Sequence, residues 1–190
     1  MTTSETDKQQ GFAAGAHVVL RPVLEDDLAA LAGLRAENPV EELPWTLQRL
    51  KQQFENEQEP GLWSADKRVF VAVRHQGEVV GYLNECQSKQ AGIYWCFTHV
   101  ADRLHDRDEV GCDLVSAYLA YKQKWHNPRR ISFDILGCES DKAAWLNAGG
   151  FELELTCERM VMHRGHPESI CTYAWYSEQL KQALAGRDQE

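Results

Sequence analysis

The chain has 190 residues, of which 43% are hydrophobic and 26% charged, and its formal net charge is −9. This length and composition fit one globular domain with a sizeable core. The excess of acid argues against nonspecific binding to nucleic acids or anionic membranes and suits a cationic partner such as an amine, although an acidic surface also serves solubility.

Residues 1–10 are polar, and we expect a disordered tail at residues 1–15 before one domain at residues 16–190. They lack the apolar core of a signal peptide, and no apolar run reaches the roughly 20 residues of a membrane span, so we expect a cytoplasmic protein. The six cysteines form no Cys-x-x-Cys pair, which indicates reduced packing residues. The oligomeric state, a homodimer included, stays open.

The first half of the domain combines two helices with a hairpin. Apolar residues predict a strand at 17–22, and helical spacing with acids in the first turn predicts a helix at 24–34. Pro44 and Trp45 precede a second helix, at 46–57. Two strands joined by a glycine-containing turn then form a hairpin, at 68–74 and 79–86.

The second half alternates strands and helices before it ends in a hairpin. We expect a strand at 92–99, a helix at 114–125, a strand at 128–136, a helix at 141–148, a hairpin of 151–163 with 170–175, and a helix at 177–185. The helical crossover between the strands at 92–99 and 128–136 makes them parallel. The fold class is therefore α/β, a single domain with a mixed, mostly antiparallel sheet, a central parallel strand pair and flanking helices.

The loop between residues 99 and 114 stands where an anion-binding loop often occurs. A glycine turn before a helix leaves backbone N–H groups and the positive end of the helix dipole free for a phosphate. Its charged side chains are mostly acidic, and around the expected phosphate position Asp106, Asp108, Glu109 and Asp113 stand against Arg103 and Arg107. The architecture indicates a nucleotide-type cofactor, whereas the charges argue against an ordinary one.

The order of these elements, with several short phrases, resembles the GNAT superfamily of N-acetyltransferases. The branch that acetylates ribosomal-protein N-termini and small amines is the most similar. The phrases span about residues 17–176 and are Val19-Leu20-Arg21-Pro22 with Glu25-Asp26-Asp27-Leu28 after it, Gly77 to Tyr82, Ile93-Tyr94-Trp95, Ala148 to Glu154, and Gly165. The resemblance implies acyl transfer from acyl-CoA, most simply acetyl-CoA, to a primary amine of a small molecule or peptide.

The resemblance also implies where the donor binds. In that family the strands equivalent to 92–99 and 128–136 splay apart around the thioester, and a loop patterned Gln/Arg-x-x-Gly-x-Gly/Ala holds the pyrophosphate. Here the loop falls on residues 108–113, where only Gly111 fits the pattern. The implied donor-binding residues are Thr98, Val100, Arg103, Arg107, Glu109, Val110, Gly111, Cys112, Asp113 and Glu139.

Several positions depart from the family pattern. Asp108 and Asp113 replace a cation or amide and a small residue, and a carboxylate about 4 Å from a phosphate charge costs roughly 1 kcal/mol in water and about 4 kcal/mol at an effective dielectric near 20. The acids could instead point outward with Arg103 and Arg107 turned in. Downstream, the family often has asparagine, a small residue and a tyrosine acid where this chain has Glu139, Lys142 and Leu146.

Three side chains are candidates for the chemistry. Glu85 or His99, the latter with an ordinary pKa near 6.5, could take the proton of the amine, and Tyr94 could act as an acid or shape the acceptor pocket. Each residue also has a purely structural interpretation: Glu85 as a carboxylate on a strand surface, His99 as a histidine packed at a strand end, and Tyr94 as a core tyrosine. A backbone N–H near residues 98–100 would polarise the carbonyl.

Histidine pairs give no metal site by spacing. His99 with His105, and His163 with His166, have no third ligand at a typical distance in the sequence, so we expect no metal.

Three functions remain open from the sequence. The first is the N-acyltransferase that uses acyl-CoA. The second is the same fold with another acyl donor, a carrier protein or an aminoacyl-tRNA, although the charge of −9 weighs against tRNA. The third is a non-catalytic protein that binds a ligand or partner on this fold.

Overall fold

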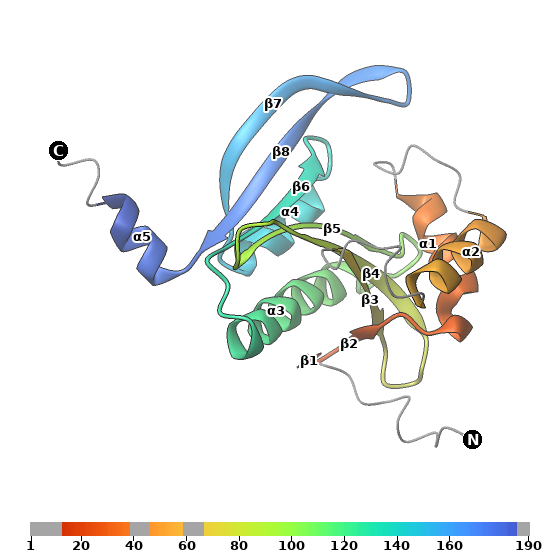
Figure 1. The fold of residues 1–190 in the computed structure, drawn as a ribbon. Coiled ribbons are helices and arrows are strands. Elements are labelled where there is room, and N and C mark those ends of the chain that lie inside the picture. The colour runs from red at the N-terminus through yellow and green to blue at the C-terminus, as the bar shows by residue number, and fades with distance from the viewer. Residues whose placement is uncertain (1–12, 39–45, 59–66, 186–190) are drawn as a thin grey trace.

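The computed structural model describes residues 13–38, 46–58 and 67–185, and these build one eight-stranded sheet with helices on both faces (Figure 1). In chain order the elements are β1 Ala13–Ala14, β2 Val19–Pro22, a 3-10 turn Glu25–Asp27, α1 Leu28–Glu37, α2 Leu47–Gln58, β3 Lys67–Val73, β4 Val79–Gln87, β5 Ile93–Val100, α3 Arg107–Trp125, β6 Arg130–Leu136, α4 Ser140–Ala148, β7 Glu152–His163, β8 His166–Tyr176 and α5 Glu178–Ala185.

The strand order is β1-β2-β3-β4-β5-β6-β8-β7. Only β5 and β6 run parallel, and every other neighbouring pair is antiparallel. The expected fold class, a mixed and mostly antiparallel sheet around one parallel pair, is therefore confirmed. The β7–β8 hairpin extends away from the body of the molecule (Figure 1).

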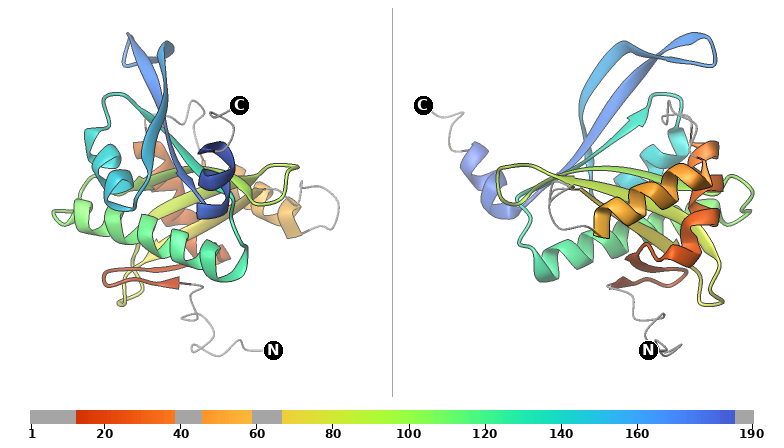
Figure 2. Two further views of the ribbon diagram at one scale, coloured as in Figure 1. Left: turned by 90° about the vertical axis from the view of Figure 1, so that its left-hand side faces the viewer. Right: turned by 45° about the vertical axis from the view of Figure 1, so that its right-hand side comes forward.

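The two faces of the sheet carry separate cores. Leu114 of α3 and Trp145 of α4 pack with one set of strand residues, and Leu31 of α1 and Leu50 of α2 pack with the other. Figure 2 shows α3 and α4 on one side of the sheet and α1 and α2 on the other. Successive strand residues point to opposite faces, so His99 lies beside Tyr82 on the α1 side while Val100 belongs to the α3 core. No described helix is long and apolar enough to span a bilayer.

β5 and β6 part before they end. Their pairing covers only Ile93–Cys96 against Arg130–Phe133, although β5 continues to Val100 and β6 to Leu136. We call these unpaired ends, residues 97–100 and 134–136, the β5–β6 fork. Such a separation is what the GNAT resemblance implied for these two strands.

α3 begins seven residues earlier than expected, at Arg107 rather than at residue 114. The reason is favourable charge, because Asp108 and Glu109 occupy the first turn, where carboxylates interact well with the helix dipole. The acidic residues that seemed to belong to a loop are therefore part of a helix start.

The N-terminal segment also differs from the prediction. Ala13–Ala14 form β1 instead of continuing a tail, and the remaining tail residues, 1–12, lie outside the described residues, as do Pro44 and Trp45. The carboxylate of Asp113 accepts hydrogen bonds from the backbone N–H groups of Ala16, His17 and Val18 at 2.9, 2.8 and 2.9 Å. These contacts fix the turn between β1 and β2 against α3.

Candidate active site

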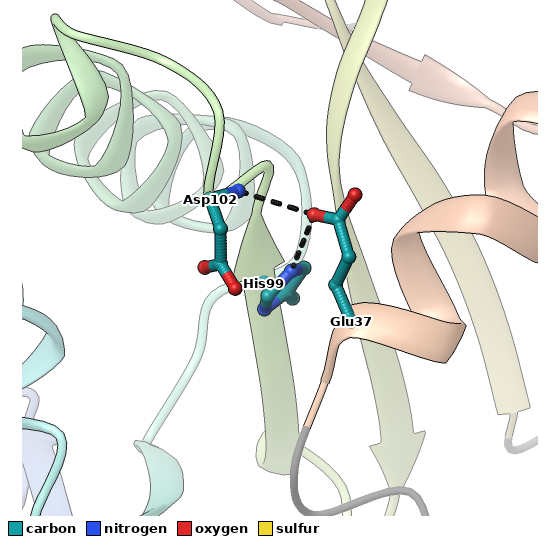
Figure 3. Close-up of side chains that lie close together, drawn as sticks. All are labelled: Glu37, His99 and Asp102. Carbon is teal, nitrogen blue, oxygen red and sulfur yellow. Dashed lines mark hydrogen bonds and ion pairs between the residues drawn. The ribbon is translucent and has the colours of Figure 1, made fainter.

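A histidine and two acids meet beside the β5–β6 fork. His99 near the end of β5, Glu37 at the end of α1 and Asp102 just after β5 converge although 62 residues separate the first two (Figure 3). Glu37 Oε2 lies 3.5 Å from His99 Nε2 and accepts the backbone N–H of Asp102 at 3.1 Å. The docking of α1 on the sheet thus brings a carboxylate to the imidazole.

His99 is a neutral base at neutral pH. Its side chain is 1% exposed, and burial, followed by the positive charge of Lys142, lowers its pKa to about 4. Because Glu37 is an acceptor, it favours the tautomer with the proton on Nε2. Nδ1 is buried and has no hydrogen-bond partner among the described residues, so it is available to accept a proton.

Most of the charged side chains around the start of α3 already contact this chain. Asp106 pairs with Arg74 at 2.5 Å, and Asp108 accepts the indole N–H of Trp145 at 2.9 Å. Arg103 pairs with Glu78 of the β3–β4 turn at 3.0 Å, on an exposed surface. Together with the contacts of Asp113 to the N-terminal segment, these interactions turn three of the acids away from any ligand at the helix start. They also leave Arg103 directed outward.

Arg107 links three parts of the site. Its Nε donates to the carbonyl of Val100 at 3.2 Å, and its guanidinium contacts Asp102 at 3.2 Å and also pairs with Asp141 of α4. It lies 5.1 Å above the ring centre of Trp145. The arginine that the sequence suggested for phosphate binding is therefore neutralised by two carboxylates at the β5–β6 fork.

Backbone N–H groups remain the anion-binding element of this helix. Within the described residues no side chain caps α3, and its first intrahelical bond runs from Val110 N–H to Asp106. The N–H groups of residues 107–109 therefore face the N-terminal end of the helix, where the dipole favours negative charge. Glu109 lies in this turn and is exposed.

Gly111 has a different role from the one the motif suggested. A Cβ at this position would lie 2.2 Å from the Trp145 ring, so glycine is required for α3 and α4 to pack closely. Val110 is buried in the core on this face, and Cys112 packs against it. Gly111 thus serves the close packing of α3 and α4, and Val110 and Cys112 belong to the core on this face.

Glu139 and Lys142 form an ion pair where the family pattern has an amide and a small residue. Lys142 Nζ lies 2.6 Å from Glu139 Oε1, and Glu139 Oε2 accepts the N–H of Leu136, the last residue of β6, at 2.8 Å. Lys142 is 2% exposed, and Leu146, one turn later, is core. Glu139 and Lys142, the two residues that depart from the family pattern here, thus compensate each other's charge at the β5–β6 fork.

Glu85 and Tyr94 occupy the other side of the sheet, beneath α3. Glu85 Oε2 contacts Lys122 Nζ at 2.6 Å and accepts the Tyr118 hydroxyl at 2.6 Å. Tyr94 packs on the same ammonium, 3.9 Å from its ring centre, and burial raises the pKa of its hydroxyl. Both residues are enclosed in the core beneath α3, and the catalytic roles expected of them stay predictions.

Thr98 and Val100 lie in the unpaired part of β5. Thr98 is buried and its hydroxyl donates to the carbonyl of Tyr82 at 2.9 Å, so only its backbone is available to a ligand. Residues 98–100 pair with β4 on one side and do not pair with β6 on the other. The backbone N–H that we expected here to polarise the carbonyl stays a prediction.

Sequence reasoning missed Glu37, Asp102 and Asp141 as members of the site. No signal in the sequence connects Glu37 with His99, because their contact depends on the docking of α1. Ligand atoms of Glu37, His99 and Asp102 lie within 4.8 Å of one another, a spacing that could admit a metal ion. Such an ion would compete with Arg107 for Asp102 and would be repelled by Lys142.

Comparisons with known proteins support the fold. No protein-family model and no curated sequence matches the chain. RimJ from Mycobacterium smegmatis, in complex with CoA-disulfide, is 20% identical over 90% of this chain and 90% of that chain, with a TM-score of 0.69. Spermidine N-acetyltransferase from Vibrio cholerae, in complex with CoA and spermine, is 14% identical over 87% and 99%, with a TM-score of 0.74.

A GNAT-family acetyltransferase from Bacillus anthracis is 14% identical over 86% of this chain and 97% of that chain, with a TM-score of 0.70. At these identities the similarity establishes the fold, and it confirms that the chain has the GNAT fold that its sequence resembled.

Proposed function

We propose that this chain is an N-acyltransferase that moves an acetyl group from acetyl-CoA to the primary amine of a small molecule or peptide by direct attack. The observation that carries the proposal is the β5–β6 fork, which opens beside the uncapped N-terminus of α3 and next to a buried histidine with a free Nδ1. Proteins of the same fold include RimJ in complex with CoA-disulfide and a spermidine N-acetyltransferase in complex with CoA and spermine.

His99 would take the proton of the attacking amine. Glu37 holds the Nε2 side of the ring, which leaves the lone pair on Nδ1 to take the proton. Because the pKa of His99 is about 4, the imidazole is unprotonated and ready at neutral pH, and it accepts the proton only as the N–C bond forms. Glu37 acts as a positioning residue for this base.

The fork and the first turn of α3 would hold the donor. Acetyl-CoA supplies an acyl group activated as a thioester, and the backbone N–H groups of residues 98–100 are placed to polarise its carbonyl. Negative charge fits the N–H groups of residues 107–109, with Arg107 as the nearest cation and Glu109 and Glu139 at the edges of the same site. The residues present therefore fit the donor once Arg107 is released from Asp141.

Calorimetric titration of the full chain with acetyl-CoA at low and moderate salt tests the proposal. We expect micromolar binding that weakens as salt rises, because the nucleotide end is held by charge. Binding that is absent at millimolar acetyl-CoA would contradict the proposal.

Kinetics with spermine and with a peptide bearing a free N-terminus then test the base. His99→Asn should lower kcat by about 100-fold or more, the usual effect of losing a general base. Glu37→Gln should lower kcat less, with KM for the amine unchanged, and shift the pH profile. His105→Asn, an exposed histidine nearby, is the control that should leave both parameters unchanged.

One observation favours a second candidate, the same transfer from an acyl carrier protein. Arg107 is paired with Asp102 and Asp141, which weakens the site for nucleotide phosphates but leaves the fork for a pantetheine arm. Binding of acetyl-pantetheine at an affinity equal to or above that of acetyl-CoA would favour this donor.

A further inference from the structure

Lys142 belongs to the first turn of α4, and its neighbours in the sequence contact residues of the β5–β6 fork. Asp141, the residue before it, pairs with Arg107, whose Nε donates to the carbonyl of Val100. Glu139, three residues earlier, binds both Lys142 Nζ and the backbone N–H of Leu136 at the end of β6. The neighbours of Lys142 are therefore anchored to both strands of the fork.

His99 and Lys142 reach this place from opposite faces of the sheet. His99 lies on the α1 side, next to Tyr82 and Glu37, whereas α4 packs on α3 over the other face. Among charged groups, Lys142 has the largest effect on the pKa of His99, which it lowers. Asp102, Arg107 and Asp141 are the other charged groups that act on His99.

Acyl transfer from a thioester to an amine needs a proton for the sulfur that leaves. At the fork, Arg107 cannot give up a proton under ordinary conditions, and Leu146 has none to give. His99 is neutral, and the proposed reaction uses its Nδ1 as an acceptor. Among the described residues around the fork, Lys142 is the buried group with a transferable proton, since its partner Glu139 is an acceptor.

We propose that Lys142 is the catalytic acid of this site and gives its proton to the departing thiolate. The N–C bond forms and the C–S bond breaks, the amine proton passes to His99 Nδ1, and a proton from Lys142 Nζ passes to sulfur. The inference rests on the proposed function, since it requires a thioester donor. Afterwards the imidazolium returns a proton to the Lys142 amine through solvent, which restores both groups.

The thiol of bound CoA reports on Lys142 without any acceptor. An ammonium within about 4–6 Å of a thiolate lowers the pKa of that thiol by about one unit or more. We would follow thiolate absorbance of the CoA complex against pH, with the desulfo-CoA complex as the blank. Wild type should show a thiol pKa below that of free CoA, and Lys142→Met should bring it back to the free value or above.

Three variants keep the result interpretable. Lys122→Met removes the other lysine of a buried ion pair, far from the fork, and should leave the thiol pKa at the wild-type value. The double variant Glu139→Gln with Lys142→Met avoids an unpaired buried carboxylate, so it reports on the ammonium if the single variant folds poorly. Lys142→Arg keeps the charge without a transferable proton, so it should retain the lowered thiol pKa and lose at least about tenfold in kcat.

A change of leaving group completes the test. With acetyl-CoA, Lys142→Met should lose about 100-fold in kcat. With an acetyl thioester of an acidic aryl thiol, which leaves without a proton, the loss should shrink to a few fold. An equal loss with both donors, or a bound thiol whose pKa is the same with and without Lys142, would overturn the assignment. Failure of wild type to bind CoA at all would instead overturn the proposed function, and this assignment with it.

Discussion

Two buried lysine–glutamate pairs lie on the α3 side of this molecule, and they are built differently. Lys122 and Glu85 are 0% and 1% exposed, and Lys142 and Glu139 are 2% and 10% exposed. In both pairs nitrogen and oxygen are 2.6 Å apart. The two pairs thus have the same N–O distance but different surroundings.

The first pair is enclosed by aromatic rings. Lys122 lies 3.9 Å from the ring centre of Tyr94 and 5.6 Å from the ring centres of both Tyr118 and Tyr121, and Glu85 binds the Tyr118 hydroxyl. The second pair is held by the backbone of Leu136 and stands at the β5–β6 fork beside the Asp141–Arg107 pair. The comparison teaches that burial of a charge does not by itself mark a site, and that position must be considered as well. Only the second pair stands where two neighbouring strands separate.

Loss of the enclosed lysine should have the largest effect on stability. Lys122→Met leaves Glu85 in the core without its cation, and breaking a buried pair in this way costs about 3–5 kcal/mol. Urea unfolding of the variant should show that loss. Glu85→Gln added to Lys122→Met should restore most of it, because the amide still accepts the Tyr118 hydroxyl. A single variant within 1 kcal/mol of wild type would mean that the aromatic enclosure is open to water.

Acid should destabilise the fork through His99. Its folded pKa of about 4 is below the ordinary 6.5, so the unfolded chain binds a proton first as pH falls. The contribution is complete above pH 6.5 and is lost as pH falls to about 4, a total of about 3 kcal/mol. The difference in unfolding free energy between wild type and His99→Gln should change by that amount over this window.

The pKa of His99 should also respond differently to substitution of the two lysines. Lys142→Met should raise the pKa of His99 and reduce the loss in acid, because the charge of Lys142 lowers that pKa. Lys122→Met should leave the pKa of His99, measured by NMR titration, unchanged. Equal shifts in both variants would contradict the placement of Lys142 at the fork.

The fold was predictable from the sequence because strand and helix periods are local signals. The strand pair at 92–99 and 128–136 was correctly expected to be parallel, since a helical crossover allows little else. The start of α3 was not predicted correctly, because Asp106, Asp108 and Glu109 are residues typical of a loop. Acids are also favourable at the start of a helix, where they interact well with the helix dipole.

The site was predictable only in part. His99 was singled out because it stands at the end of a predicted strand, and Arg107 because it belongs to the charged segment after that strand. The direction of Asp113, however, depended on a strand, β1, that two alanines do not reveal. The contact of Glu37 with His99 arises from tertiary packing alone. Glu139, the N-cap of α4, and Lys142, three residues later in its first turn, are the pair whose spacing could have been read as an ion pair.

Release of Arg107 should strengthen binding of acetyl-CoA moderately. Asp141→Asn removes one of the two carboxylates that neutralise this guanidinium, so affinity should rise by about threefold to tenfold at low salt. The matched variant Asp102→Asn should have a smaller effect, because Asp102 is 59% exposed against 28% for Asp141. Calorimetry measures both. A fall in affinity on Asp141→Asn would mean that Asp141 orders α4 for the donor and does not compete with it.

Substitution of Arg103, at the rim of the site, should have the smallest effect on stability and on the affinity for acetyl-CoA. Arg103 was expected to bind phosphate, but its guanidinium pairs with Glu78 at 3.0 Å on a surface where both side chains are about half exposed. Exposed pairs of this kind contribute under about 1 kcal/mol, so Arg103→Ala should change stability little and leave the affinity for acetyl-CoA within about twofold. Glu78→Gln is the control, since it frees Arg103 without removing it. If Arg103→Ala instead weakened binding tenfold and reduced its salt dependence, the loop after β5 would have to turn inward when the donor binds, and Arg107 would not be the cation that meets it.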